Sequence, residues 1–140
     1  MERLYVVEHQ EIYKDYHLVV VFNNAFRCGY VGLKVGHKLE DKHYDDVDFE
    51  VHGGLTYSSI ANEKWAKEGY RWYFGFDCAH LYDGVDIESM KKYGANEISV
   101  MCWSHLDGEI RTQEYVLIEL KNLVNQIEEK GEIKWQSQRT

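Results

Sequence analysis

A stripe of apolar residues near the end of the chain constrains the fold most. After Thr112, a good N-cap residue, apolar side chains recur at the spacing of one helix face: Val116, Leu117, Leu120, Leu123, Val124 and Ile127. Gly131 is expected to end this helix. A helix with one apolar face has to bury that face, so we expect it to lie across one face of a sheet.

Before this helix, most of the chain has the sequence patterns of β-strands. Residues 18–22 are apolar at every position, which is typical of an interior strand covered on both faces. The other expected strands are residues 4–8, 27–35, 46–51, 55–58, 70–76 and 98–103. Residues 86–93 favour a short helix with Asp86 as its N-cap, and Asp107 followed by Gly108 is a hairpin-turn signal leading into residues 109–111. This order predicts an α+β fold, with a mainly antiparallel sheet, a long C-terminal amphipathic helix packed on one face and a short helix.

The length of 140 residues fits one domain. We expect residues 1–131 to form a single α+β domain and residues 132–140 to be a polar tail in which only Ile133 and Trp135 could pack. The longest apolar run is far shorter than the roughly 20 residues needed to span a bilayer. No signal-peptide pattern precedes the first strand, and three Cys at wide spacings do not suggest a disulfide framework. The sequence therefore predicts a cytoplasmic protein without a membrane partner.

The net charge of -8 bears on the class of partner. A protein that binds a polyphosphate backbone needs a basic face to release counterions, so duplex DNA or RNA is a poor partner. A small anionic ligand is still compatible, because a local site needs only a few converging donors. The sequence is also compatible with assembly into a homo-oligomer.

Two clusters of reactive side chains lie at expected element ends. In the first, His52 precedes Gly53 and Gly54, which places an imidazole beside backbone amides that carry no side chains. The hydroxyl donors that follow are Thr56, Tyr57, Ser58 and Ser59. The group could hold a phosphate or carboxylate. A glycine turn between two strands explains it equally well, because the Lys and the following helix of a P-loop are missing.

In the second cluster, Asp77, Cys78 and His80 follow an aromatic strand. Together with His52 they could form a three-ligand metal site, or Asp77 could orient His80 as a general base. Alternatively, Asp77 accepts backbone hydrogen bonds in its loop and Cys78 is a small buried residue. Only one short-spaced pair of zinc ligands is present, so we expect no metal and no cofactor. We expect both clusters to face one concave site.

The strand between the clusters has two different faces. Tyr70, Trp72, Phe74 and Phe76 share one face, which we assign to the core, while Arg71, Tyr73 and Gly75 occupy the other, which could meet a ligand or water. Arg27 and Arg71 are natural partners for an anionic group, or else they pair with the surplus acids. Asp46, Asp48 and Glu50 form the outer face of another expected strand, as a cation site or as a solvated surface.

Three motifs carry a resemblance. HGGLTYS at 52–58, WYFGFDCAH at 72–80 and EYVLIEL at 114–120 resemble an uncharacterised family of small phage and bacterial proteins, over most of residues 27–126. The family has no established activity, so the resemblance implies no catalytic roles. It implies the context of a phage protein acting in the host cytoplasm against host machinery, including by sequestering nucleotide-derived defence signals.

Two functions of different classes follow. The first is a binding protein, a host-defence antagonist that captures a small nucleotide-like or phosphorylated signal molecule, with stacking from Tyr57 or Trp72. Its ligand-binding residues would be His52, Gly53, Gly54, Thr56, Tyr57, Ser58, Arg71, Asp77 and His80. The second is a small hydrolase or transferase, with or without a metal ion, that uses His52, Asp77 and His80. An acidic protein with many rings and no complete catalytic set fits binding better. On that reading, His52→Ala should weaken binding and leave thermal stability nearly unchanged.

Overall fold

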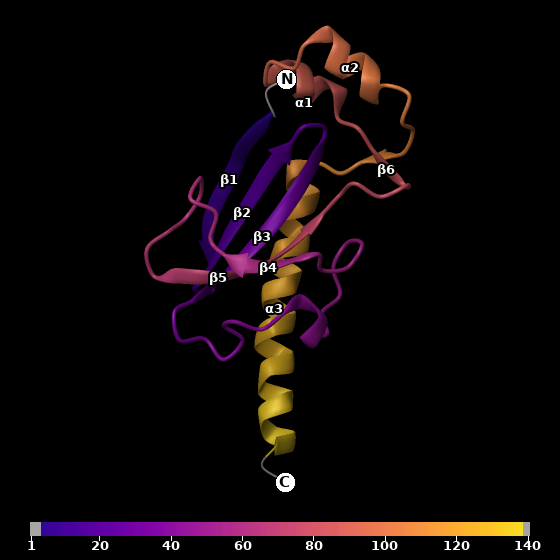
Figure 1. Cartoon of the computed structure of the whole chain (residues 1–140). Coiled ribbons are helices and arrows are strands. Elements are labelled where there is room, and N and C mark those ends of the chain that lie inside the picture. Colours follow the sequence, from indigo (N-terminus) through magenta and orange to yellow (C-terminus); the bar gives the residue numbers. More distant parts are fainter. Residues whose placement is uncertain (1–3, 139–140) are drawn as a thin grey trace.

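The computed structural model describes residues 4–138, with side chains described as far as Lys130 (Figure 1). Five antiparallel strands form one sheet in the order β1-β2-β3-β5-β4. Their bounds are β1 (Tyr5–Tyr13), β2 (Tyr16–Asn23), β3 (Phe26–Lys34), β4 (Tyr57–Ile60) and β5 (Tyr70–Asp77). The expected interior strand is confirmed, because every side chain from Leu18 to Phe22 in β2 is fully buried. The β1–β2 turn consists of Lys14 and Asp15, both at positive φ, as the tightest hairpins require.

The helix α3 (Gln113–Gln138) crosses one face of this sheet (Figure 1). Thr112 caps it, since its Oγ1 accepts a hydrogen bond from the Tyr115 backbone N–H at 3.1 Å. The apolar stripe packs on β2, β3 and β5, and its fully covered members are Val116, Leu120, Leu123, Val124 and Ile127. The α+β architecture is thus confirmed. The helix does not end at Gly131 but continues to Gln138, so the expected stop is wrong. The side chains of Ile133 and Trp135 lie outside the described part.

The opposite face of the sheet is also covered, by the loop that joins β4 to β5. Trp65 of this loop packs on Tyr73, with ring centroids 4.7 Å apart, and both side chains are buried. The expectation that this face meets a ligand or water is therefore wrong at Tyr73 and Gly75, which are buried, while Arg71 on the same face is exposed. Tyr57 belongs to the same layer, because its ring lies edge-on to Tyr30 at 5.0 Å.

The connection between β5 and α3 forms a small lobe at one end of the sheet (Figure 1). It contains β6 (Asp83–Gly84), α1 (Ile87–Lys92), α2 (Glu97–Trp103) and β7 (Glu109–Ile110). The short helix is confirmed as α1, with Asp86 as its N-cap. The strand expected at 98–103 is instead the helix α2, capped by Asn96. The hairpin expected after Gly108 is also wrong, because β7 pairs with β6 in parallel.

The strand expected at 46–51 does not form. A 3-10 helix, η1 (Tyr44–Asp46), ends at the first of these residues, with His43 as its N-cap, and residues 47–51 have no strand pairing. The alternation itself is real, because Val47, Phe49 and Val51 pack against the core. The backbone of Glu50, however, exchanges two hydrogen bonds of 2.7 Å with the side chain of Gln126 on α3. The segment therefore follows the helix, and its acids do not line a strand face.

In the described part of the chain, no helix combines the length and the apolar character needed to cross a membrane.

His17 on β2 makes stability depend on pH. Its Nδ1 lies 2.6 Å from the Tyr73 hydroxyl and its Nε2 lies 2.8 Å from Gln10 Oε1. Burial, helped by the charge of Lys67, lowers the pKa of His17 from 6.5 to about 4. The free energy of unfolding should therefore fall by about 3 kcal/mol as the pH is lowered from 6.5 to 4. In this window His17 binds a proton in the unfolded chain but stays neutral in the folded protein.

Urea unfolding of the wild type and of His17→Gln across this range measures the effect. The neutral amide cannot titrate, so the variant should lose less stability on acidification. Equal losses in the two proteins would show that another group is responsible.

Candidate functional site

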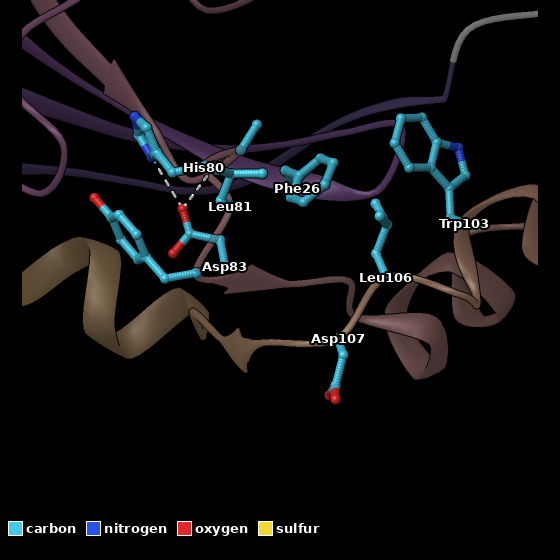
Figure 2. A pocket seen from close by; sticks show the side chains of 9 residues that line it. Phe26, His80, Leu81, Asp83, Trp103, Leu106 and Asp107 are labelled. Atoms are coloured by element: carbon cyan, nitrogen blue, oxygen red, sulfur yellow. Dashed lines mark hydrogen bonds and ion pairs between the residues drawn. The ribbon is translucent and has the colours of Figure 1, made fainter.

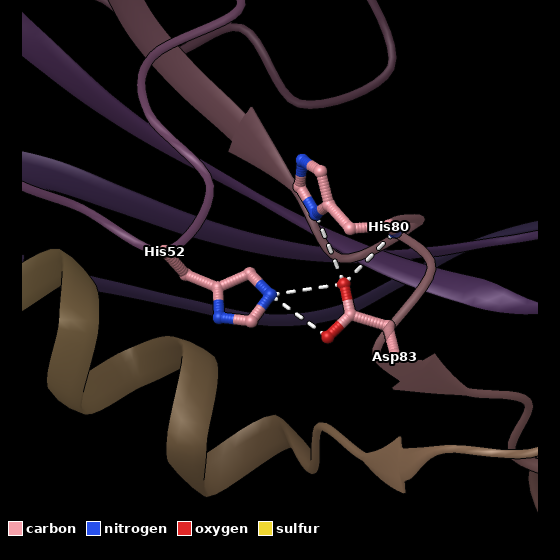
Figure 3. Close-up of side chains that lie close together, drawn as sticks. All are labelled: His52, His80 and Asp83. Atoms are coloured by element: carbon pink, nitrogen blue, oxygen red, sulfur yellow. Dashed lines mark hydrogen bonds and ion pairs between the residues drawn. The ribbon is translucent and has the colours of Figure 1, made fainter.

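A buried carboxylate is the centre of the candidate site (Figure 3). His52 Nε2 lies 2.9 Å from both oxygens of Asp83, and His80 Nδ1 lies 3.0 Å from Asp83 Oδ2. The backbone N–H of His80 donates to the same oxygen at 3.0 Å, and Arg111 Nε donates to Oδ1 at 2.9 Å. Burial would raise the pKa of Asp83, but the hydrogen bonds from His52, His80 and Arg111 outweigh it and lower the pKa to about 2. Asp83 is therefore ionised.

Short local structures bring these groups together from distant parts of the chain. His80 and Asp83 belong to one turn after β5, which the Asp83 N–H closes by donating to the His80 carbonyl at 2.9 Å. The parallel pair β6–β7 places Asp83 opposite Glu109, so that Arg111 reaches the carboxylate. His52 enters from the loop before β4. The site thus depends on three separate segments.

Gly53 explains how closely the two predicted clusters meet. It has a φ of +70°, and a Cβ atom added there would lie 2.2 Å from His80 Cε1. No other residue type fits such a position without a shift of the imidazole. The rings of His52 and His80 are 5.5 Å apart. The turn at Gly53 and Gly54 therefore lies against the strand end at His80. The expected shared concave site is wrong, because the hollow beside His80 is lined by residues 79–83 and not by this turn.

His52 joins this site to α3. Its Nδ1 is 2.8 Å from the Tyr115 hydroxyl, and its backbone N–H donates to Glu119 Oε1 at 2.8 Å. Only 8% of the residue is exposed. We therefore replace the expectation that His52→Ala spares stability, because its removal would leave Asp83 and Tyr115 without a buried partner.

Three other members of the first cluster have structural partners. Thr56 Oγ1 donates to Asp77 Oδ2 at 3.1 Å, and Ser58 Oγ accepts from the Tyr44 N–H at 3.0 Å. The Tyr57 hydroxyl donates to the Ile60 carbonyl. Of these, Thr56 is the residue that connects to the second cluster.

Asp77 and Cys78 lie beside the buried centre without joining it. Asp77 accepts a hydrogen bond from the Ala79 N–H at 3.1 Å, the loop role expected of it, and its Oδ1 is 4.0 Å from His80 Nε2. Orientation of His80 comes from Asp83 and not from Asp77. Cys78 is buried, and burial raises the pKa of its thiol, which opposes a role as nucleophile or metal ligand.

Arg27 and Arg71, the expected partners of an anionic group, do not reach the site. Arg71 donates to Glu40 Oε1 at 2.6 Å and to Asp41 Oδ1 at 2.7 Å, six residues before Asp77 on β5. Arg27 is buried and holds Glu8 and Asp86. Both arginines therefore pair with acidic side chains, which was the alternative to binding an anionic group. Trp72, proposed for stacking, donates its indole N–H to the Lys42 carbonyl and packs on the core.

A cavity of about 720 Å³ adjoins the buried centre (Figure 2). Its lining combines aromatic and aliphatic side chains with polar groups: Phe26, Ala79, His80, Leu81, Tyr82, Asp83, Trp103, Leu106 and Asp107. The ring of Tyr82 stacks on His80, with centroids 5.5 Å apart and an interplanar angle of 8°. Phe26 and Trp103 meet edge to face at 5.4 Å. The cavity therefore offers ring surfaces next to a charged, hydrogen-bonded end.

Sequence reasoning missed Asp83, Arg111 and Trp103. Asp83 follows His80 by three residues, so the spacing could have included it in the second cluster. Arg111 and Trp103 lie in segments whose secondary structure was mispredicted, and no local pattern points to them.

Comparisons of the chain with protein-family models, with curated proteins and with solved structures find no match. The function therefore has to be argued from the geometry of the site.

Proposed function

We propose that the protein binds a small ligand with a planar ring, of the nucleobase-containing class, in the cavity beside His80. The observation that carries the proposal is the lining of this cavity, in which Phe26, Tyr82 and Trp103 provide ring surfaces and His80 and Asp83 border the polar part. Its volume of about 720 Å³ lies in the range of ligand pockets. Aromatic side chains stack on every base, which makes a planar ring the natural occupant.

The charges favour recognition of the ring over recognition of a phosphate. Within the described residues, Arg27, Arg71 and Arg111 each form an ion pair with at least one carboxylate. A phosphate would have to compete with these acids for the guanidinium groups. The proposed ligand is therefore nucleotide-like by its base, and any phosphate on it contributes little to the affinity.

The same proposal includes the role that the resemblance implies. A phage protein that holds a nucleotide-derived defence signal in the host cytoplasm would act as a host-defence antagonist by lowering the free signal concentration. The ring-lined cavity supports this role by its chemistry, because such signals contain a base.

Titration with the four ribonucleosides and their monophosphates tests the proposal. Trp103 lines the cavity, so a bound base should quench its fluorescence, and the quenching should be missing in Trp103→Phe. Tyr82→Ala should weaken binding about 10-fold, since base stacking contributes on the order of 1–3 kcal/mol. Tyr82 is 52% exposed, so the melting temperature should stay unchanged.

Ile60→Ala is the matched control, because Ile60 is 57% exposed and belongs to β4, outside the cavity. It should leave binding unaltered. Inorganic phosphate serves as a second probe. Binding of phosphate alone, or no response to any nucleoside, would contradict recognition of a ring in this cavity.

A second candidate, a small hydrolase or transferase, is favoured by the Asp83–His80 pair. An ionised carboxylate on Nδ1 fixes the tautomer that leaves the Nε2 lone pair free to accept a proton, as a general base requires. The set differs from the expected one, because Asp83 takes the place of Asp77. Chromatography of the incubated monophosphates distinguishes the candidates, since a binder returns them unchanged and a hydrolase converts them. His80→Gln should abolish any conversion.

A further inference from the structure

We propose that His52, His80 and Asp83 form a binding site for one divalent metal ion, with Zn²⁺ as the ion that fits best. Within the described residues, this is the group of His, Cys, Asp and Glu side chains whose ligand atoms all lie within 4.8 Å of one another. Two imidazole nitrogens and one carboxylate oxygen are a ligand set that zinc accepts. The proposal does not depend on the proposed ligand, because the ion alone tests it.

The distances leave little rearrangement to be made. His52 Nε2 and His80 Nδ1 lie 2.9 Å and 3.0 Å from Asp83 Oδ2 (Figure 3). Bonds of about 2.0–2.1 Å to a tetrahedral zinc place ligand atoms roughly 3.4 Å apart. These two separations therefore have to widen by about half an ångström to admit the ion, and the third, between the two imidazole nitrogens, lies within 4.8 Å. Arg111 occupies Oδ1, and Oδ2, which also accepts the His80 N–H, has a second lone pair for the metal.

The tautomers that a bound ion needs have different support at the two imidazoles. An ion bound at His52 Nε2 and His80 Nδ1 requires the remaining ring proton to be on the opposite nitrogen of each neutral ring. The Tyr115 hydroxyl is 2.8 Å from His52 Nδ1, and Asp77 Oδ1 is 4.0 Å from His80 Nε2. Tyr115 is thus an outer partner of the kind that orients metal-binding histidines, whereas the separation at His80 Nε2 exceeds a hydrogen bond.

The local charge also favours a dication. The carboxylates of Asp77, Asp83 and Glu119 contact the two histidines, and Arg111 is the cation that contacts Asp83. Three negative charges and one positive charge leave room for an ion of charge two. Three protein ligands would leave one tetrahedral position open, and His80 and Asp83 also border the cavity. This departs from the expectation of no metal, because Asp83 supplies the ligand that sequence reasoning missed.

Calorimetric titration of chelator-treated protein with Zn²⁺ tests the site, with Co²⁺ absorption as a second readout. We expect one Zn²⁺ per chain at micromolar or tighter affinity and a tetrahedral Co²⁺ spectrum. His80→Ala should weaken Zn²⁺ binding by at least about 100-fold, because loss of a ligand exceeds the loss of an outer partner. His105→Ala is the control, since it removes an exposed imidazole outside the group and should bind normally.

Circular dichroism of metal-free His80→Ala checks that the variant is folded. If it is not, ring-nitrogen NMR of the wild type decides, because Zn²⁺ should switch the tautomers of His52 and His80. No Zn²⁺ binding by the wild type, unaltered binding by folded His80→Ala, or unchanged tautomers of both rings would each overturn the proposal.

Discussion

Replacement of Arg27 by Met is expected to lower the free energy of unfolding by about 3–5 kcal/mol. The guanidinium donates to Glu8 Oε1 at 2.6 Å and to Asp86 Oδ2 at 2.8 Å. The side chains of Arg27 and Glu8 are only 6% and 2% exposed. Removal of the positive charge would leave the Glu8 carboxylate buried and unneutralised. The hydrogen bond from the Tyr93 hydroxyl would remain. Urea unfolding measures the loss.

Arg71→Met is the matched control for this prediction. Arg71 is also a strand residue with two carboxylate partners, but its side chain is 43% exposed. Water can solvate Glu40 and Asp41 after the substitution, so the loss should stay below about 1 kcal/mol. Similar losses in both variants would show that burial of the Arg27 pair does not decide its contribution. In a Glu8→Gln background, Arg27→Met should be less harmful, since the carboxylate is no longer present.

Leu120→Ala should lower the free energy of unfolding by about 2–5 kcal/mol. Leu120 is fully buried on α3, and it lies so close to β3 that a Cβ atom added at Gly29 would be 2.9 Å from its Cδ2. The sheet and helix cannot close completely over the space that the smaller side chain leaves. Thermal and urea unfolding report the change. Ile118→Ala is the control on the same helix, and because Ile118 is 51% exposed, its loss should stay within about 0.5 kcal/mol. Equal losses would contradict the assigned helix face.

The parts of the fold that sequence predicts well are those with dense, regular patterns. The stripe on α3 and the uninterrupted apolar run in β2 each have to be buried: Leu18 and Val20 pack with the stripe, and Val19 and Val21 pack on the opposite face of the sheet. The strand prediction for the α2 segment was wrong because Ile98 and Met101 are apolar and yet 66% and 72% exposed. They concealed the helical spacing of Val100 and Trp103, which contact the core of the small lobe.

The site was predictable to the extent that it depends on element ends. His52 and His80 could be identified because each stands beside a turn or strand end, and the two do meet. Asp83 and Arg111 could not be joined from sequence, because the two-residue pairing of β6 with β7 brings them together. Such a short parallel contact has no periodic pattern. The same reason explains residues 47–51, whose backbone partner is a side chain on α3.

The irregular register of β1 also affects how copies of the chain can meet. The pairing of β1 with β2 shifts between Val7 and His9, and the residue at this bulge is Glu8, whose side chain turns inward to Arg27. β1 is an outermost strand, and the other outermost strand, β4, has only four residues. A bulge with an inward charge on one border and a very short strand on the other both discourage intermolecular strand addition. Any self-association of this protein should therefore use its helices or loops. Glu8 has two roles: it neutralises the buried Arg27, and it protects the border strand against fibril-like growth.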